Sequence, residues 1–152
     1  MSSQSSASSH SALSCTDGIA TGMSDAWMLV SRVLMASVLL MTAWPGSPNP
    51  GFLNSLGLPN PAFWSFVAIA VEVIVSISLI LGVGIRYGAL LGILYVIIAT
   101  ALAHRYWAYP QAQQGAQYTN FLKNLAIIGG LLAVFVNGGG RYSIDAMLSG
   151  KR

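Results

Sequence analysis

Four ionisable side chains of this chain lie within or at the ends of long apolar stretches. They are Arg32, Glu72, His104 and Lys123. A charge inside the hydrocarbon of a bilayer costs about 3 kcal/mol, so such residues are functional candidates by default. Carboxyl, imidazole and amine groups in that setting can carry protons or hydrogen-bond to polar ligands. We therefore take Glu72, His104 and Lys123 as the candidates for proton transfer.

Glu72 lies in the middle of one apolar stretch. Ser65, Ala68, Glu72 and Ser76 recur at helical spacing, which predicts a small, polar stripe on one face. That face should look into a helix bundle and away from lipid. A carboxyl group there must either meet a cation or remain protonated.

Arg32 is the predicted partner of Glu72. By helix rise, Arg32 lies about 9 Å and Glu72 about 13 Å from the same membrane face. The arginine stem covers that difference, so we expect an Arg32–Glu72 pair in the bundle interior. Two roles remain open: a structural pair that fixes helix register, or a proton or quinone-hydroxyl partner.

A second group of polar and aromatic residues flanks the third and fourth apolar stretches. Its members are His104, Trp107, Tyr118, Lys123 and Asn124. They belong to one membrane side and can meet as a polar pocket with an aromatic wall, which predicts a substrate-binding site together with Arg32 and Glu72. Alternatively, Lys123 extends to the lipid headgroups and His104 caps its helix.

The elements that position these residues are four transmembrane helices. Of the 152 residues, 55% are hydrophobic and only 7% are charged, whereas a soluble domain carries about 25% charged residues. A span needs about 20 apolar residues. The predicted spans are 26–44, 62–81, 87–104 and 120–137, with loops over 45–61 and 105–119. The predicted fold is an all-α, integral-membrane bundle of four helices.

The chain divides into a tail, a membrane domain and a short end. Residues 1–24 are Ser-rich and are predicted to be disordered. Residues 25–147 form the membrane domain, and residues 148–152 a C-terminal tail. Within the spans, the repeat of Gly84, Gly88 and Gly92, like Gly129–Gly130, predicts close helix approach.

Basic residues indicate the orientation in the membrane. One side carries Arg32, Arg86, Arg141, Lys151 and Arg152, and the other carries Arg105 and Lys123. By the positive-inside rule, both termini are predicted to be cytoplasmic. Because these residues are dispersed, we expect no nucleic-acid partner. The spans hold one histidine and no nearby cysteine or aspartate, so we expect no metal site and no covalently bound cofactor.

Several runs resemble one family. These are the second-span glutamate, H-x-x-W at 104–107, LKNLAIIGG at 122–130 and G-R-Y-S-x-D at 140–145. Over residues 26–147 the chain resembles the DoxX family of bacterial membrane proteins. The resemblance implies a four-helix inner-membrane bundle with a link to quinone redox chemistry, through thiosulfate:quinone oxidoreductase subunits. The residues that match the family pattern are Arg32, Glu72, His104, Trp107, Lys123, Asn124 and Arg141. Ala43 and Trp44 stand where relatives often have Gly-Lys.

Three functions follow as hypotheses. The first is a component of a quinone-linked oxidoreductase or a redox-stress-related membrane subunit, with a quinone bound between the helices. The second is a non-catalytic membrane anchor that assembles a soluble redox enzyme. The third is a small transporter or channel, which at this length calls for a homo-oligomer. The sequence leaves open the substrate, the electron donor and whether the chain is catalytic.

Overall fold

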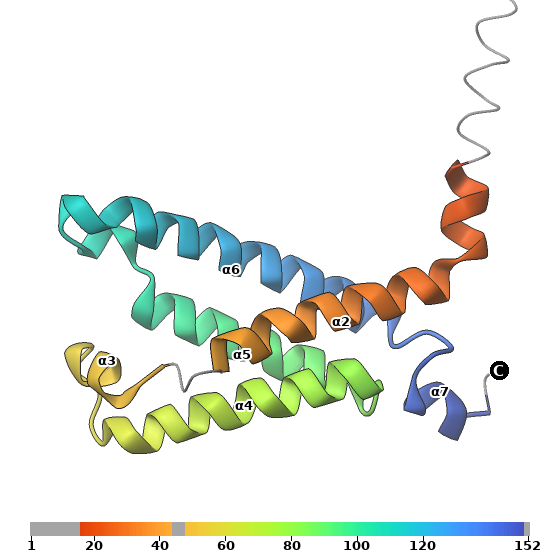
Figure 1. Cartoon of the computed structure of the whole chain (residues 1–152), viewed down its shortest axis with the longest axis horizontal. Coiled ribbons are helices and arrows are strands. Elements are labelled where there is room, and N and C mark those ends of the chain that lie inside the picture. The colour runs from red at the N-terminus through yellow and green to blue at the C-terminus, as the bar shows by residue number, and fades with distance from the viewer. Residues whose placement is uncertain (1–15, 44–47, 151–152) are drawn as a thin grey trace, which may run out of the picture.

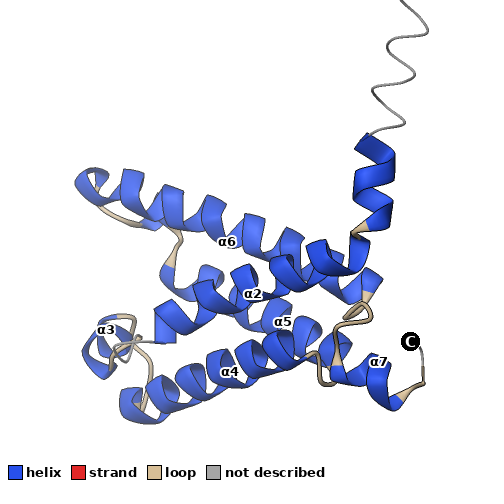
Figure 2. Cartoon of the chain, turned by 45° about the vertical axis from the view of Figure 1, so that its right-hand side comes forward, coloured by secondary structure: helices blue, strands red, loops and turns tan. Residues whose placement is uncertain are grey.

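Four long helices make up most of the protein. The computed structural model describes residues 16–43 and 48–150. The long helices are α2 (Ser24–Ala43), α4 (Pro61–Leu81), α5 (Ile85–Ala103) and α6 (Gln111–Asn137). All four are long and apolar enough to cross a membrane. The described residues contain no strand (Figure 2), which confirms the predicted all-α fold of four membrane-spanning helices.

Three short helices connect or follow the long ones. They are α3 (Pro50–Ser55), the 3₁₀ helix η1 (Tyr106–Ala108) and α7 (Ile144–Leu148). The link between α4 and α5 is only three residues long, and Gly82 and Gly84 both have positive φ, at 68° and 54°. Glycine adopts this backbone conformation without steric cost, which lets α4 and α5 form a tight antiparallel hairpin.

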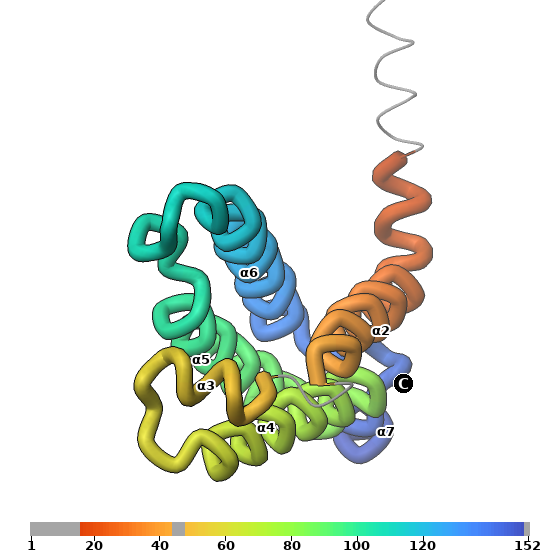
Figure 3. Tube along the Cα trace, turned by 60° about the vertical axis from the view of Figure 1, so that its left-hand side comes forward, coloured from red at the N-terminus to blue at the C-terminus, as the bar shows by residue number. Residues whose placement is uncertain are grey.

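The long helices form a ring in which each one packs against two others. α2 packs mainly on α4, α5 packs mainly on α6, and the contacts α4–α5 and α2–α6 close the ring (Figures 1 and 3). We call one end of the bundle the clasp end; it holds the start of α2, residues 82–84 and residues 138–148. The opposite end, the loop end, holds α3 and residues 104–110.

Apolar residues fill the bundle and also cover its outside. Ala36, Val75, Leu79, Ala89 and Leu131 are fully buried in the core. Many other large apolar side chains on the same helices are exposed, as expected for a surface that faces lipid.

Glycines permit the closest helix contacts, as predicted for two positions of the repeat. A Cβ at Gly88 would lie 2.1 Å from Ser78 Oγ on α4, and one at Gly92 would lie 3.0 Å from Val75. Gly130 similarly meets Met35 of α2, but Gly129 has no such neighbour within 4 Å. The third member of the repeat, Gly84, instead provides a positive φ.

Some predicted boundaries differ from the structure. α6 begins at Gln111, so most of the predicted 105–119 loop is helical, and α3 interrupts the predicted 45–61 loop. The Gln- and Ala-rich segment after Pro110 consists largely of good helix formers, which the apolarity criterion overlooked. In the predicted disordered tail, residues 16–22 are helical. Residues 1–15, Trp44, Lys151 and Arg152 lie outside the described residues.

Candidate functional site

Arg32 is completely buried at the clasp end. Its Nε donates to the carbonyl oxygen of Leu79 at 2.8 Å, and its Nη2 donates to that of Ile80 at 3.0 Å. Its other donors bind the carbonyls of Gly139 and Tyr142. The last carbonyls of a helix have no partner within it, so Arg32 satisfies the end of α4 and ties residues 138–142 to α2.

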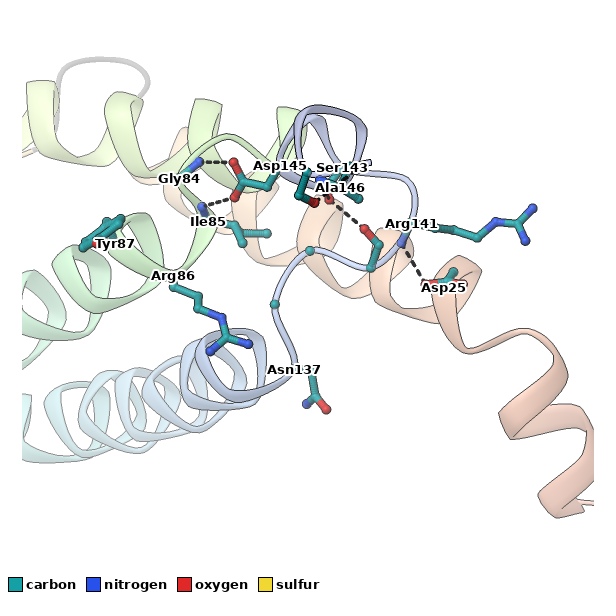
Figure 4. A pocket seen from close by; sticks show the side chains of 14 residues that line it. Asp25, Gly84, Ile85, Arg86, Tyr87, Asn137, Arg141, Ser143, Asp145 and Ala146 are labelled. Carbon is teal, nitrogen blue, oxygen red and sulfur yellow. Dashed lines mark hydrogen bonds between the residues drawn. The ribbon is translucent and has the colours of Figure 1, made fainter. Parts of the chain in front are cut away.

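Asp145 completes the clasp from the C-terminal segment. Its two carboxylate oxygens accept hydrogen bonds from the backbone N–H groups of Gly84, at 2.8 Å, and Ile85, at 2.9 Å (Figure 4). Its own N–H donates to the Gly82 carbonyl at 3.0 Å. A carboxylate at a helix N-terminus satisfies free N–H groups and the helix dipole. Asp145 therefore caps α5 and holds the chain end against the α4–α5 link.

A pocket of about 790 Å³ lies among these elements. Asp25 in its wall accepts from the Arg141 N–H at 2.8 Å, and Arg86 donates to the Val136 carbonyl at 3.3 Å. The Arg141 side chain points away from the pocket (Figure 4). Because the carboxylates here already bind backbone donors, this pocket belongs to the closure of the bundle end.

Glu72 has a different environment, halfway along α4 and nearly inaccessible. Its Oε1 accepts from Tyr95 of α5 at 2.7 Å and from Thr42 of α2 at 3.1 Å. Its Oε2 is buried without a hydrogen-bond partner in the described structure. Buried polar atoms are usually paired, so the Glu72 carboxyl group is unusual in having only one of its two oxygens hydrogen-bonded.

The predicted Arg32–Glu72 pair is wrong. The bond from Ser76 Oγ to the Ala36 carbonyl, 3.3 Å long, marks where α2 and α4 lie side by side. From that level Arg32 lies about 6 Å toward the clasp end and Glu72 about 6 Å toward the loop end. The sequence estimate counted both from one face, but it ignored the free carbonyls of α4, which are nearer to Arg32 and compete for its donors.

The predicted group around His104 is only partly brought together. His104 Nδ1 lies 2.8 Å from Gln117 Oε1, and Asn124 Nδ2 donates to Thr100 Oγ1 at 2.9 Å. The Lys123 side chain is exposed and its Nζ donates to Asn120 Oδ1 at 3.1 Å on its own helix. Thus His104, Asn124 and Lys123 each have a separate partner.

The aromatic residues at the loop end do gather. The Tyr106 ring packs edge-on against Trp107, Tyr118 and Phe121, with centroids 5.0, 5.1 and 5.7 Å away. Trp107 and Phe121 are also edge-on, at 6.2 Å. Such pairs add stability beyond their buried area, so η1 and the start of α6 form an aromatic wall.

Next to that wall, a groove of about 300 Å³ lies between α5 and α6. It is lined by Ile97, Thr100, Ala101, Arg105, Trp107, Phe121, Leu125 and Ile128. Ile97 and Leu125 are about half exposed on membrane-spanning helices, so the groove opens toward lipid. Of the predicted binding residues, Trp107 lines it directly and Asn124 reaches it through Thr100.

Several residues that these sites use were not among the predicted site residues, including Arg105 and Phe121 of the groove. Tyr95 and Thr42 carry hydroxyl groups within apolar spans. Because a hydroxyl in a span needs a hydrogen-bond partner, their positions could have pointed to a polar contact. Asp145 was noticed only as part of a motif. Asp25 was not noticed, and nothing in its sequence context points to residue 141.

Comparison with known proteins decides the family. The DoxX family model matches residues 27–105, which is just over half of the 152-residue chain. The chain belongs to the DoxX family. This confirms the resemblance drawn from the sequence, and the matched part contains Arg32, Glu72 and His104 but not α6.

Two relatives from Escherichia coli (strain K12) extend the likeness of this DoxX protein. Inner membrane protein YphA is 28% identical over 122 residues, covering 78% of this chain and 87% of the relative. Inner membrane protein YqjF is 27% identical over 133 residues, covering 85% and 97%. No solved structure matches significantly. The protein is thus a DoxX-family membrane protein whose bundle resembles these two over nearly their full length.

Proposed function

We propose that this DoxX protein resides in the inner membrane and binds a quinone in the groove between α5 and α6, as a component of a quinone-linked oxidoreductase. The observation that carries the proposal is the groove itself, which combines an opening toward lipid, an aromatic wall and hydrogen-bond donors at one edge. A quinone has the matching features: it dissolves in the bilayer, its ring is planar, and its carbonyl oxygens accept hydrogen bonds.

The shape and lining of the groove favour such a ring. Trp107 and Phe121 stand on one side, and Ile97, Leu125 and Ile128 supply apolar surface. Ligand sites are mostly apolar with a few placed polar groups. Aromatic walls stack on flat rings, so a planar head fits here better than a branched acyl chain.

The polar edge of the groove can hold a carbonyl oxygen. Arg105 and the Trp107 indole carry N–H donors that make no hydrogen bond within the described part of the chain. Thr100 is less available, because its hydroxyl already donates to the Val96 carbonyl at 2.6 Å. We therefore assign the carbonyl contact to Arg105, and Trp107 packs against the ring.

Reduction of a quinone takes two electrons and two protons. We assign one of these protons to the imidazole of His104, which precedes Arg105 in the chain without itself lining the groove, and the other to water at the loop end. The electrons would come from a partner oxidoreductase. Lys123 and Glu72 do not line the groove and have no assigned role at the ring.

The inner-membrane location and the orientation belong to the proposal. The relatives YphA and YqjF are named as inner membrane proteins. The clasp joins the start of α2 to residues 139–142, so the described parts next to both termini lie at one end. With the excess of basic residues there, that end is proposed to face the cytoplasm.

Mass spectrometry of organic extracts tests the proposal. We expect protein purified gently in detergent to carry a stoichiometric quinone. Arg105→Met and Phe121→Leu should lose it, because they remove the guanidinium donors and one ring of the aromatic wall. Phe66→Leu is the matched control, since Phe66 is a lipid-exposed aromatic residue of α4 outside the groove.

Two results would contradict the proposal. The first is wild-type protein without quinone; if it then co-purifies with a soluble redox enzyme, the chain acts as a non-catalytic anchor. The second is quinone that the two groove variants retain as fully as Phe66→Leu does, which would place the binding site elsewhere in the bundle.

A further inference from the structure

Glu72 is a buried carboxyl group in the bundle that has no part in the groove between α5 and α6. It is 4% exposed, and less than 1 Å² of its Oε2 is accessible, with no hydrogen-bond partner in the described structure. Leaving a buried polar atom unpaired costs about 1–3 kcal/mol. Membrane spans carry such groups rarely, and where they do the groups mark ion or proton paths.

A hydrogen-bonded chain leads from Glu72 to the surface of the bundle. Thr42 of α2 contacts Oε1 at 3.1 Å, and its hydroxyl also lies 2.7 Å from the Leu39 carbonyl. The Val38 carbonyl is a third acceptor, at 3.3 Å. A hydroxyl has one proton, so Thr42 donates it to one of these acceptors at a time. Thr42 is exposed and stands one residue before the end of α2, at the level of a membrane interface.

The other contacts of Glu72 are closed. Tyr95 donates to Oε1 at 2.7 Å from α5. Ser76 donates to the backbone carbonyls of Glu72 and Ala36. The remaining charged groups of the helices packed on α4, Asp25 and Arg32 of α2 and Arg86 of α5, are engaged at the clasp end, and α3 has no ionisable side chain.

We propose that Glu72 is an intramembrane proton-binding site that exchanges its proton with the loop-end membrane surface through the Thr42 hydroxyl. The ligand is a proton because Oε2 has no accessible surface for a water-sized group. For loading, Thr42 passes its proton to Glu72 Oε1 and takes one from a hydronium ion at the surface of the bundle, which is left as water. Unloading reverses both transfers, so the hydroxyl is unchanged. The site is independent of the proposed quinone groove.

The composition of the chain gives a direct experiment, since Glu72 is its only glutamate. The full-length protein is labelled with ¹³C at the glutamate side-chain carboxyl and placed in lipid nanodiscs. We expect one carboxyl resonance whose chemical shift changes reversibly with the pH of the medium. The assignment needs no variant, so it stands even where Glu72→Gln misfolds.

Substitutions at Thr42 test the route. Thr42→Val removes the hydroxyl at constant shape and should abolish the pH response within the measuring time, whereas Thr42→Ser should keep it. Ser37→Ala is the matched control, because Ser37 is a partly exposed residue of α2 whose hydroxyl, within the described part of the chain, bonds to the Leu34 carbonyl alone. A resonance that ignores pH in the wild type would overturn the site. A response that Thr42→Val leaves intact would overturn the route.

Discussion

The two ends of the bundle use polar groups in opposite ways. At the clasp end, Arg32 and Asp145 direct their donors and acceptors to backbone groups, and each joins segments far apart in the sequence. Toward the loop end, the side-chain N–H groups of Arg105 and Trp107 have no hydrogen-bond partner among the described residues, and neither does Glu72 Oε2. The buried charged groups of the clasp end are hydrogen-bonded within the protein, whereas the loop end has polar groups that can still bind a ligand.

This difference separates stability from function within one small chain. A buried charge that is fully hydrogen-bonded contributes to a unique structure and is expensive to disturb. A polar group without a hydrogen-bond partner lowers the stability of the fold and gains a partner only when a ligand or proton binds. Clasp variants should therefore destabilise the protein, while loop-end variants should leave its stability nearly unchanged and alter what it binds.

The largest effect is expected for Arg32→Ala. It leaves the carbonyls of Leu79, Ile80, Gly139 and Tyr142 buried without a donor, so we expect a loss of about 3–5 kcal/mol in the free energy of unfolding. Arg32→Lys, which keeps the charge but has fewer donors, should fall in between. Denaturant titration in detergent measures both. A loss below about 1 kcal/mol for Arg32→Ala would mean that the clasp is not what closes the bundle.

Asp145→Ala should have an intermediate effect. The first N–H groups of α5 lose their cap, which typically costs about 1–2 kcal/mol. Asp145→Asn keeps one acceptor and should lose about half of this. The same titration applies, with the exposed Asp17→Ala as the control. An equal change in Asp145→Ala and Asp17→Ala would remove Asp145 from the clasp.

Glu72→Gln should have the smallest effect on stability. The amide oxygen still accepts from Tyr95 and Thr42, so we expect a change below about 1 kcal/mol in the free energy of unfolding. Thermal unfolding beside Arg32→Ala gives the comparison on one scale. If Glu72→Gln destabilises the protein as much as Arg32→Ala does, Glu72 is a structural residue and the contrast between the two ends fails.

The fold could be predicted because membrane spans follow from local composition. Runs of about 20 apolar residues bounded by prolines and glycines give helices wherever they occur, so all four spans were found. The glycine repeat likewise predicted the contact of Gly88 with α4. The start of α6 was misplaced, because residues 111–119 are helical without being apolar.

The partners of the buried charges could not be predicted in the same way. The position of Arg32 along its helix can be read from the sequence. Its acceptors cannot, because they are backbone carbonyls, which every residue type has. Whether Lys123 faces the bundle or lipid depends on the rotation of α6 about its axis, which the apolar residues on all sides of the helix after Asn124 do not encode. The aromatic wall could be predicted from the sequence, because Trp and Tyr are enriched where spans end at the membrane interface.

Photolabelling with a light-activated quinone in native membranes directly tests whether a quinone binds in the groove between α5 and α6. We expect the label to attach to peptides spanning residues 97–107 and 121–128 and excess quinone to compete with it. Arg105→Met should lose the label, while the control Phe66→Leu should retain it. Labelling of α2 or α4 instead, or labelling that excess quinone does not reduce, would contradict the assignment of the loop end as the ligand site.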